Sequence, residues 1–237
     1  MSAVELRFRY GTLEVSGLDR QDKTLPASCL WDPRAACHRG PAMAYADVVL
    51  ALRAAGLSYD DQARRYTAFE RPLRVDREPR PYQREGLEAW RKAGNRGVVV
   101  LPTGAGKSHL AMMALDLRRR STLVIAPTLD LVRQWYDLLR IHFGTPVGIV
   151  GGGEHEVCEL TVTTYDSAYL HMDRFGDRFG LLVFDEVHHL PGPSISSAAE
   201  RSIAPFRLGL TATLERPDQL HLQLDDLVGP VVYRKEI

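Results

Sequence analysis

The chain has 237 residues, of which 45% are apolar, and its 30 basic and 30 acidic side chains give a formal net charge of zero. This length allows one large domain or two ordinary ones, and zero net charge means that any contact with nucleic acid depends on a local patch or on backbone amides. No apolar run is long enough to span a bilayer, and the first ten residues lack the apolar stretch of a signal peptide, so we expect a soluble cytoplasmic protein with no membrane partner.

The cysteines argue against a disulfide-stabilised or zinc-stapled protein. Cys29, Cys37 and Cys158 are odd in number and widely spaced, and no C-x-x-C pair is present. We therefore expect neither a disulfide framework nor a structural metal held by cysteine.

The N-terminal region has the pattern of a small mixed α+β domain. Apolar residues alternate over 4–10 and again over 13–15, with Gly11 between the two runs, which predicts a β-hairpin. Residues 47–56 predict a helix with Asp47 as its N-cap and a glycine as its stop. We expect this domain to cover residues 1–60.

A charged, proline-rich linker is expected over residues 61–80, and from residue 81 onward short apolar strands alternate with helices. Continuous apolar strands separated by helices indicate a mainly parallel sheet with helices on both faces, so we predict an α/β domain over residues 81–237. Its strands are expected at 97–102, 121–128, 160–167, 180–188 and 207–213.

The segment 129–143 predicts the clearest amphipathic helix of this domain. Its buried stripe is expected to hold Leu131, Trp135, Leu138 and His142, with Arg133, Asp137 and Arg140 turned to solvent.

The segment "LPTGAGKS", residues 101–108, follows the first of these strands and opens a helix. A loop in that place presents backbone N–H groups and a helix N-terminus to a polyphosphate, while Lys107 adds a positive charge and Ser108 a hydroxyl for Mg²⁺. Gly104 and Gly106 let the backbone approach the phosphates closely. A leucine replaces the first glycine of the full G-x-x-x-x-G-K-[ST] pattern, so the motif has the truncated T-G-x-G-K-S form.

The segment "LLVFDEVHHLPG", residues 181–192, places two carboxylates at the end of another apolar strand. Ligands of open α/β sheets bind outside the carboxyl ends of the strands, so Asp185 can share a site with the phosphate loop and hold its Mg²⁺, while Glu186 polarises a water. Zinc would need a different histidine spacing and a third ligand, and we expect His188 and His189 to point to opposite sides of an extended backbone. His188 is instead a candidate relay of nucleotide state.

Six segments occur in the order and spacing of the motifs of superfamily 2 helicases: "PYQREGLEAW", "LPTGAGKS", "APTLDLVRQW", "TTYDSAY", "DEVHH" and "LGLTATLER". The DEVHH form, with "SIAPFRLGLTATLER" downstream, resembles the XPB (Rad25-type) family of repair helicases in its compact archaeal or bacterial form. The resemblance runs from about residue 78 to the end, and "WDPRAACHRGPAMAYADVVLALRAAGLSYDD" is similar to the XPB damage-recognition domain. It implies a RecA-like P-loop lobe and an ATP- and Mg²⁺-dependent DNA helicase or translocase of nucleotide excision repair, associated with the nucleoid.

The resemblance also implies roles for single residues of the nucleotide site. Gln83 matches the glutamine that recognises adenine, which suits an amide because it offers both a donor and an acceptor. Arg80 beside it is a candidate partner for the base, by stacking, or for a phosphate. The phosphate loop then supplies Thr103, Gly104, Ala105, Gly106, Lys107 and Ser108. Thr211 and Thr213 match motif III, which couples nucleotide state to the grip on DNA.

The residues that match the DNA strand track of the family are Thr128, Arg133, Gly151, Gly152 and Thr164. In the family these loops contact phosphates without reading sequence, and an ordinary turn or helix cap is the alternative for each residue. Arg216 begins the tripeptide Arg216-Pro217-Asp218, where the family has Arg-Glu-Asp. Because proline replaces the carboxylate and restricts φ, strand separation through this element is in doubt.

A superfamily 2 motor hydrolyses ATP between two RecA-like lobes, and no Q-x-x-G-R-x-x-R motif follows "GPVVYRKEI" at the end of this chain. An arginine finger contributes about 10³ to 10⁵ in rate, so we expect this chain to hydrolyse ATP poorly and a longer parent to be a DNA-stimulated ATPase. The alternatives are a motor fragment of a restriction-system helicase subunit, a non-motor module that binds damaged DNA, or a small-molecule P-loop kinase. The expected partners are single-stranded, forked or damaged DNA and, from archaeal relatives, a nuclease; the expected oligomeric state is a monomer.

Four arginines of the N-terminal region are candidate phosphate contacts: Arg34, Arg39, Arg64 and Arg65. The alternative is a solvated face on which Asp32, Asp60 and Asp61 are their partners. Trp31 could stack on a base, but a lone tryptophan near a turn more often belongs to a core.

Overall fold

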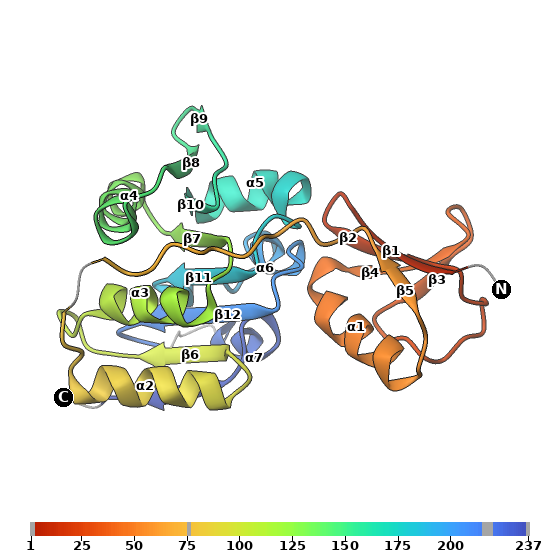
Figure 1. The fold of residues 1–237 in the computed structure, drawn as a ribbon, viewed down its shortest axis with the longest axis horizontal. Coiled ribbons are helices and arrows are strands. Elements are labelled where there is room, and N and C mark those ends of the chain that lie inside the picture. Colours follow the sequence, from red (N-terminus) through yellow and green to blue (C-terminus); the bar gives the residue numbers. More distant parts are fainter. Residues whose placement is uncertain (1–2, 75–76, 215–219, 236–237) are drawn as a thin grey trace.

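The computed structural model describes residues 3–74, 77–214 and 220–235. They form two sheets, a five-stranded one near the N-terminus and an eight-stranded one after it, and Figure 1 shows the two side by side. Within the described part, no helix is long and apolar enough to cross a membrane.

The smaller sheet has the strand order β3-β4-β2-β1-β5. The predicted hairpin is confirmed, because β1 and β2 pair antiparallel with Phe8 opposite Leu13. The strand β5 lies parallel to β1 and closes the other edge. The five strands are β1 (Val4–Arg9), β2 (Thr12–Ser16), β3 (Leu30–Asp32), β4 (Cys37–Pro41) and β5 (Tyr59–Asp61).

The helix α1 (Tyr45–Ala54) covers one face of this sheet, and its predicted start was wrong. A 3-10 turn, η1 (Ala42–Ala44), runs directly into the helix, so Asp47 lies in the first turn and caps nothing. A side chain caps a helix only from an extended residue just before it, and this junction contains none. The predicted glycine stop is present, with Gly56 at φ +67°.

The larger sheet has the order β13-β6-β12-β11-β7-β10-β8-β9, and its strands pair in parallel except for β8 with β9. The five predicted apolar strands are confirmed as β6, β7, β10, β11 and β12, each ending slightly earlier than expected. The strands are β6 (Arg96–Val100), β7 (Thr122–Ala126), β8 (Val147–Gly151), β9 (Glu154–His155), β10 (Leu160–Thr164), β11 (Leu181–Asp185), β12 (Phe206–Thr211) and β13 (Val231–Arg234).

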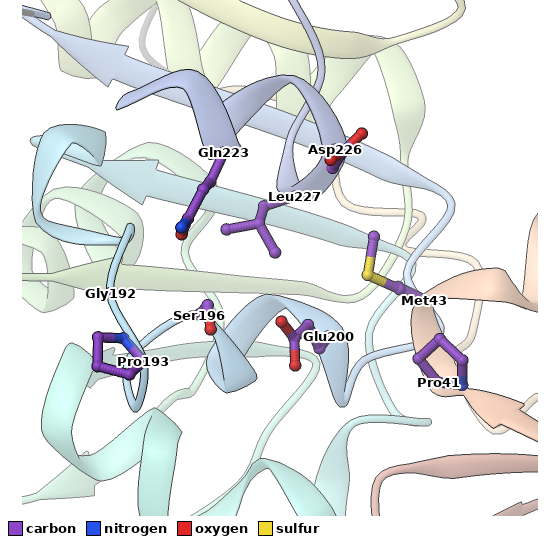
Figure 2. Close-up of a pocket in the computed structure, with 9 residues that line it drawn as sticks. All are labelled: Pro41, Met43, Gly192, Pro193, Ser196, Glu200, Gln223, Asp226 and Leu227. Atoms are coloured by element: carbon purple, nitrogen blue, oxygen red, sulfur yellow. The ribbon is translucent and has the colours of Figure 1, made fainter. Parts of the chain in front are cut away.

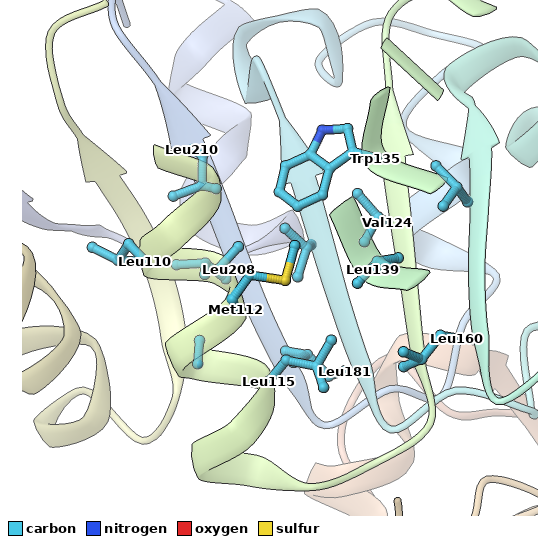
Figure 3. Packing of buried hydrophobic residues seen from close by; sticks show 14 of the residues in the cluster. Leu110, Met112, Leu115, Val124, Trp135, Leu139, Leu160, Leu181, Leu208 and Leu210 are labelled. Carbon is cyan, nitrogen blue, oxygen red and sulfur yellow. The ribbon is translucent and has the colours of Figure 1, made fainter. Parts of the chain in front are cut away.

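Helices cover both faces of this sheet, as predicted. One apolar cluster joins the sheet to α2 (Pro81–Lys92), α3 (Lys107–Arg118) and α4 (Leu129–Phe143), and Figure 3 shows its packing. A second cluster joins the other face to α5 (Tyr165–Phe175), α6 (Ser197–Glu200) and α7 (Leu224–Leu227). Along β6 the side chains alternate between the clusters, because Val99 belongs to the first and Val98 and Val100 to the second. The short turns are η2 (Val187–His189) and η3 (Leu220–Gln223).

The helix α4 has the predicted bounds, but its predicted buried stripe was displaced. The fully buried residues are Val132, Trp135, Leu139 and Phe143, whereas Leu131, Leu138 and His142 are only partly buried. Both sets recur with the period of a helix, so periodicity alone could not separate them. Packing against β7, β8 and β10 selects the set.

The small sheet lies at the amino ends of the strands of the large sheet. Ile203, just before β12, is buried in the apolar cluster of the small sheet, and Met43 packs against the second cluster of the large one. The backbone N–H of Arg65 donates to the carbonyl of Asp177, just before β11, at 3.0 Å. A cavity of about 540 Å³ lies at this junction, between Met43 on one side and Ser196 and Leu227 on the other (Figure 2). The division into residues 1–60, 61–80 and 81–237 stays a prediction.

A buried arginine ties this junction together. Arg207 in β12 is fully buried, and its guanidinium donates to the carbonyl oxygens of Leu227 at 2.6 Å, Ser202 at 2.9 Å and Ala204 at 3.2 Å. Burial, and then the nearby Arg96, lowers the pKa of Arg207 to about 9. The three carbonyls therefore hold a cation that forms no ion pair with a described carboxylate, although the charge of Asp47 opposes the lowering of its pKa.

Replacing Arg207 with Met should lower the free energy of unfolding by about 2–4 kcal/mol, because three carbonyl oxygens lose their donors. Urea unfolding followed by circular dichroism measures this loss. The matched control is Arg96→Met in the neighbouring strand, where one bond of 3.3 Å to the carbonyl of Asp226 is lost. Equal losses in the two variants would contradict a special role for Arg207.

Candidate nucleotide and DNA sites

The phosphate loop connects β6 to α3 at the carboxyl edge of the sheet. Gly104 and Gly106 have φ of +76° and +81°, which other residues adopt only with strain. Gly106 is the N-cap of α3 and makes no side-chain cap bond, so the N-cap residue leaves the backbone N–H groups of the first turn uncapped. The space where a side chain of Gly104 would stand is open. This loop suits a polyphosphate, as the sequence predicts.

The acidic end of β11 lies against this loop. The Nζ of Lys107 is 3.0 Å from Oε1 of Glu186, so the structure brings together two of the three predicted catalytic side chains. Glu186 has φ of +45°, and this left-handed residue turns the chain out of the strand. Burial would raise the pKa of Glu186, but the hydrogen bond and charge of Lys107 outweigh it and lower the pKa. Glu186 is therefore ionised and held against the phosphate loop.

The third predicted catalytic residue, Asp185, is nearly buried and has two aromatic partners. The indole N–H of Trp135 donates to Oδ2 of Asp185 at 2.8 Å, and the hydroxyl of Tyr165 donates to its carbonyl oxygen at 2.9 Å. Burial raises the pKa of Asp185, and the bond from Trp135 opposes that rise. From the sequence, Trp135 was expected only in an apolar stripe, and Tyr165 was not singled out. The available signal was that a buried indole or phenol needs a partner for its polar group.

Mg²⁺ fits the oxygen donors of this site. Ser108 follows Lys107 in the first turn of α3, and Asp185 has a carboxylate at the same edge of the sheet. Mg²⁺ commonly takes one or two protein ligands and completes its shell with water and phosphate oxygens. Among the residues the structure describes, no three His, Cys, Asp or Glu side chains gather as a metal cluster would require.

The two histidines do not lie as predicted. Residues 187–189 form a 3-10 turn instead of an extended strand, so the rings of His188 and His189 lie together, 4.3 Å apart and inclined by 36°. The cause is the left-handed Glu186, which ends the strand one residue before the turn.

The candidate coupling residues gather around one hydroxyl. Oγ1 of Thr211 lies 2.9 Å from Nδ1 of His188, 3.2 Å from Oε2 of Glu186 and 2.6 Å from the carbonyl oxygen of Thr213. A hydroxyl has one proton, so it can donate to only one of these two oxygens at a time. The structure thus brings His188, Thr211 and Thr213 together beside the Glu186 carboxylate.

Gln83 ties α2 to the phosphate loop in this structure. Its side chain is buried, with Nε2 donating to the carbonyls of Ala105 at 2.9 Å and Gly106 at 3.1 Å. Its Oε1 accepts from the backbone N–H of Arg80 at 2.9 Å. Both ends of the amide are therefore engaged within the protein, and recognition of adenine by Gln83 stays a prediction.

A cavity of about 390 Å³ opens beside Gln83. Arg80, Tyr82, Thr103 and Lys235 line it, and the Arg80 guanidinium donates to the Tyr82 hydroxyl at 2.7 Å. The Nζ of Lys235 lies 5.8 Å from the Tyr82 ring centre. Tyr82 and Lys235 were not singled out from the sequence. Tyr82 offers this cavity an aromatic face.

The predicted DNA-track threonines are both helix caps. The hydroxyl of Thr128 accepts from the N–H of Leu131 at 3.3 Å and starts α4, and that of Thr164 accepts from Ser167 at 3.1 Å and starts α5. The cap alternative is thus realised, and contact with DNA stays a prediction. Arg133 is exposed on α4.

The two track glycines lie against these helix starts. A Cβ on Gly151 would stand 2.8 Å from Oγ of Ser167, and one on Gly152 3.2 Å from a methyl of Leu129. The structure therefore gathers both threonines and both glycines at one end of the sheet. Arg216, with Pro217 and Asp218, lies outside the described residues.

The four N-terminal arginines have different surroundings. Arg39 pairs with Glu14 and with Asp32, the latter at 3.2 Å, whereas Arg65 reaches across the junction to Asp177 at 3.5 Å. Arg64 lies over the Tyr66 ring, and Arg34 is exposed. Of the three predicted carboxylate partners, only Asp32 forms an ion pair with one of these guanidinium groups in the described part. Asp60 instead accepts a hydrogen bond from the Gln62 amide, and Asp61 accepts one from the Tyr45 hydroxyl. Trp31 is half-buried and meets His38 edge to face.

Comparison with known families adds independent observations. Residues 76–216 match the family "Type III restriction enzyme, res subunit", and residues 6–63 match the "Xeroderma pigmentosum group B helicase damage recognition domain". The "DNA 3'-5' translocase XPB2" of Sulfurisphaera tokodaii is 47% identical over 70% of this chain and 38% of its own length. The "DNA 3'-5' helicase XPB" of Mycobacterium tuberculosis is 35% identical over 65% of this chain and 30% of its own length. The chain thus spans well under half the length of these relatives.

Solved structures share the fold at low sequence identity. The UvsW helicase of bacteriophage T4 has a TM-score of 0.59 at 16% identity, with 98% of this chain and 100% of that chain covered. The SWI2/SNF2 ATPase core of Sulfolobus solfataricus, solved with double-stranded DNA, has a TM-score of 0.55 at 18% identity, with 67% and 38% covered. These likenesses agree with a helicase-like α/β lobe that follows a small N-terminal domain.

Replacing Trp135 with Phe should weaken Mg²⁺ binding about tenfold, because the ring remains while the donor that orients Asp185 is lost. The measurement is the Mg²⁺ dependence of binding of a fluorescent ATP analogue, mant-ATP. Trp90→Phe is the matched control, since it removes a buried indole bond of 2.8 Å to the carbonyl of Arg207, far from the site. Unchanged Mg²⁺ dependence in Trp135→Phe would exclude this role.

Proposed function

The chain belongs to the XPB (Rad25-type) family of superfamily 2 DNA helicases, and from that premise we propose that it is the ATP-binding lobe and DNA-binding N-terminal domain of an ATP-driven DNA translocase. The observation that carries the proposal is the contact of 3.0 Å between Lys107 and Glu186, which joins the phosphate loop to the acidic strand end. A small-molecule kinase would leave the gathered threonines and glycines of the proposed strand track without a purpose.

In the proposed reaction each polar side chain has one task. When bound, Mg²⁺ supplies positive charge against the terminal phosphates of ATP, and Ser108 and Asp185 are the residues that would hold it. Lys107 exchanges its partner Glu186 for a phosphate. Glu186, released from the lysine, then orients a water and accepts its proton. The cavity beside Tyr82 and Arg80 would receive the adenine base, and Gln83 would form hydrogen bonds with the edge of that base.

The proposed response to DNA runs through two helices. Thr128 and Thr164 start α4 and α5, where DNA phosphates would meet the helix N-termini. Each helix also sends one aromatic side chain to Asp185, Trp135 to the carboxylate and Tyr165 to the carbonyl. A strand bound at these N-termini would therefore bias the position of the proposed metal ligand. His188 and Thr211 offer a second route, from Glu186 to the loop after β12.

The wider role is proposed from the family and from the N-terminal domain. We assign the protein to nucleotide excision repair on the nucleoid, acting on single-stranded, forked or damaged DNA as a monomer, with a nuclease as a partner. A second RecA-like lobe would supply the arginine finger.

We expect the 237-residue chain to bind mant-ATP weakly and to hydrolyse ATP slowly even with DNA, and a version extended by a second lobe to be stimulated by DNA. Lys107→Ala should reduce mant-ATP affinity at least about tenfold, since the phosphates lose a charge in a low-dielectric site. Lys92→Ala, on the surface of α2, is the control and should change nothing. Robust DNA-stimulated turnover by the 237-residue chain would refute the need for a second lobe, and absence of nucleotide binding would overturn the proposed function.

Glu186→Gln should separate binding from hydrolysis. We expect mant-ATP to bind as tightly or more tightly, because the Glu186 carboxylate no longer competes with the phosphates for Lys107. Hydrolysis by the extended protein should fall about 10²- to 10⁴-fold. Binding titrations and steady-state ATPase rates measure the two effects. A loss of affinity as large as the loss of rate would instead make Glu186 a binding residue.

A further inference from the structure

A second polar surface lies away from the nucleotide site, between α5 and the hairpin of β8 and β9. A cavity of about 370 Å³ opens there, with Val150 and Phe175 among its apolar lining residues. Its polar side chains are His155, His171, Arg174 and Arg178, and no carboxylate lines it. We call these four residues the flank surface.

The flank surface carries two arginines that form no ion pair with a described carboxylate. They are Arg174 and Arg178, and both are exposed. The rings of His155 and His171 meet edge to face at 4.9 Å. Burial lowers the pKa of His171, and the neighbouring His155 and Arg174 lower it further. This arrangement suits an anion, because arginines without an ion-pair partner attract phosphate.

The acidic residues nearby are largely engaged elsewhere. Asp177 pairs with Arg65 across the domain junction at 3.5 Å, and Glu156 accepts from the thiol of Cys158 at 3.7 Å. Glu154 precedes His155 in β9, so its side chain points to the other face of that strand. Asp173 lies on α5, and its charge opposes the lowering of the His171 pKa. Asp177 also feels the charge of Arg178, so these two carboxylates reduce part of the positive field.

The flank surface connects two regions for which DNA contacts are proposed. His155 is paired with Val150, the residue before the track glycine Gly151. At the other end, Arg178 follows Asp177, whose carbonyl accepts from the backbone of Arg65 in the predicted linker. The helix α5 spans the distance, because it starts after the track cap and ends two residues before Asp177. A DNA backbone that leaves the track toward the N-terminal domain would therefore run along this side of α5.

We propose that the flank surface binds the phosphodiester backbone of DNA between the strand track and the N-terminal domain. Arg174 and Arg178 contact phosphates, the two histidines add donors, and Phe175 with Val150 faces the sugars. Such contacts position the DNA without reading its sequence. The inference rests on the proposed function, since it needs a protein that binds DNA at its track.

The test is salt-dependent DNA binding by the 237-residue chain. Fluorescence anisotropy with a labelled 20-nucleotide oligothymidine and a labelled 20-base-pair duplex gives the affinity at several salt concentrations. In the double variant Arg174→Gln/Arg178→Gln, affinity should fall about tenfold, and the slope of log K against log salt should become shallower by roughly 1.4 to 1.8. The matched control is Arg91→Gln/Lys92→Gln, which removes two charges from α2 near the opposite edge of the sheet and should leave both quantities unchanged.

The outcomes separate this inference from the proposed function. DNA binding by the unmodified chain, with the double variant behaving like its control, would overturn only the flank surface. A loss of mant-ATP affinity in the double variant, measured without DNA and seen again when the double variant is made in the Lys107→Ala background, would mean that the surface takes a free nucleotide, which also overturns the inference. A chain that binds no DNA at all would overturn the proposed function and this inference together. Unchanged urea unfolding of the double variant, with its DNA affinity reduced, supports direct contact.

Discussion

The hydrogen bond between the indole of Trp135 and the carboxylate of Asp185 is the contact on which the rest of the candidate site depends. Asp185 sits at the end of a buried strand, where an unpaired carboxylate would be costly. The indole binds one oxygen, and the backbone N–H of Glu186 binds the other at 3.1 Å. With Asp185 held in this way, the left-handed Glu186 directs its own side chain to Lys107. The geometry of the acidic pair is therefore decided largely by a helix of the first apolar cluster.

Side chains of both apolar clusters contact the candidate site directly. Trp135 and Val132 pack in the same cluster as Leu110 of α3, the helix that the phosphate loop opens. Tyr165 packs in the cluster on the other face and still reaches the Asp185 carbonyl. A shift of α4 or α5 would therefore reach the site from either face. Tight packing favours such concerted shifts over independent local motion.

The small sheet contacts the amino ends of the strands of the large sheet, whereas the phosphate loop lies at their carboxyl ends. Ile203 and Met43 each enter the apolar cluster of the other sheet. Arg207 binds the carbonyls of Ser202 and Ala204, on either side of Ile203, and that of Leu227. DNA that touches both the strand track and the N-terminal domain would therefore have to run along the flank of the lobe. Arg174 of α5 and Arg178, which follows the end of that helix, lie on that path, and neither forms an ion pair with a described carboxylate.

Local patterns determined much of this protein. Apolar runs predicted the parallel strands, glycine spacing predicted the phosphate loop, and the motif text predicted the family, because these signals depend on near neighbours in the chain. The same patterns misplaced the start of α1, since a 3-10 turn joined to a helix leaves no site for an aspartate cap. They also misplaced the buried stripe of α4. Two sets of residues recur there with the helical period, and packing against the sheet decides which set is buried.

Only the tertiary structure decided which partners meet across long sequence separations. The contacts join residues far apart in the chain: Trp135 with Asp185, Arg207 with Leu227, and Arg65 with Asp177. The sequence around one partner does not predict the other partner. The paired rings of His188 and His189 likewise follow from one left-handed residue before them. Residue type, spacing and period are properties of the sequence alone, whereas the satisfaction of a buried polar group depends on what the folded chain brings beside it.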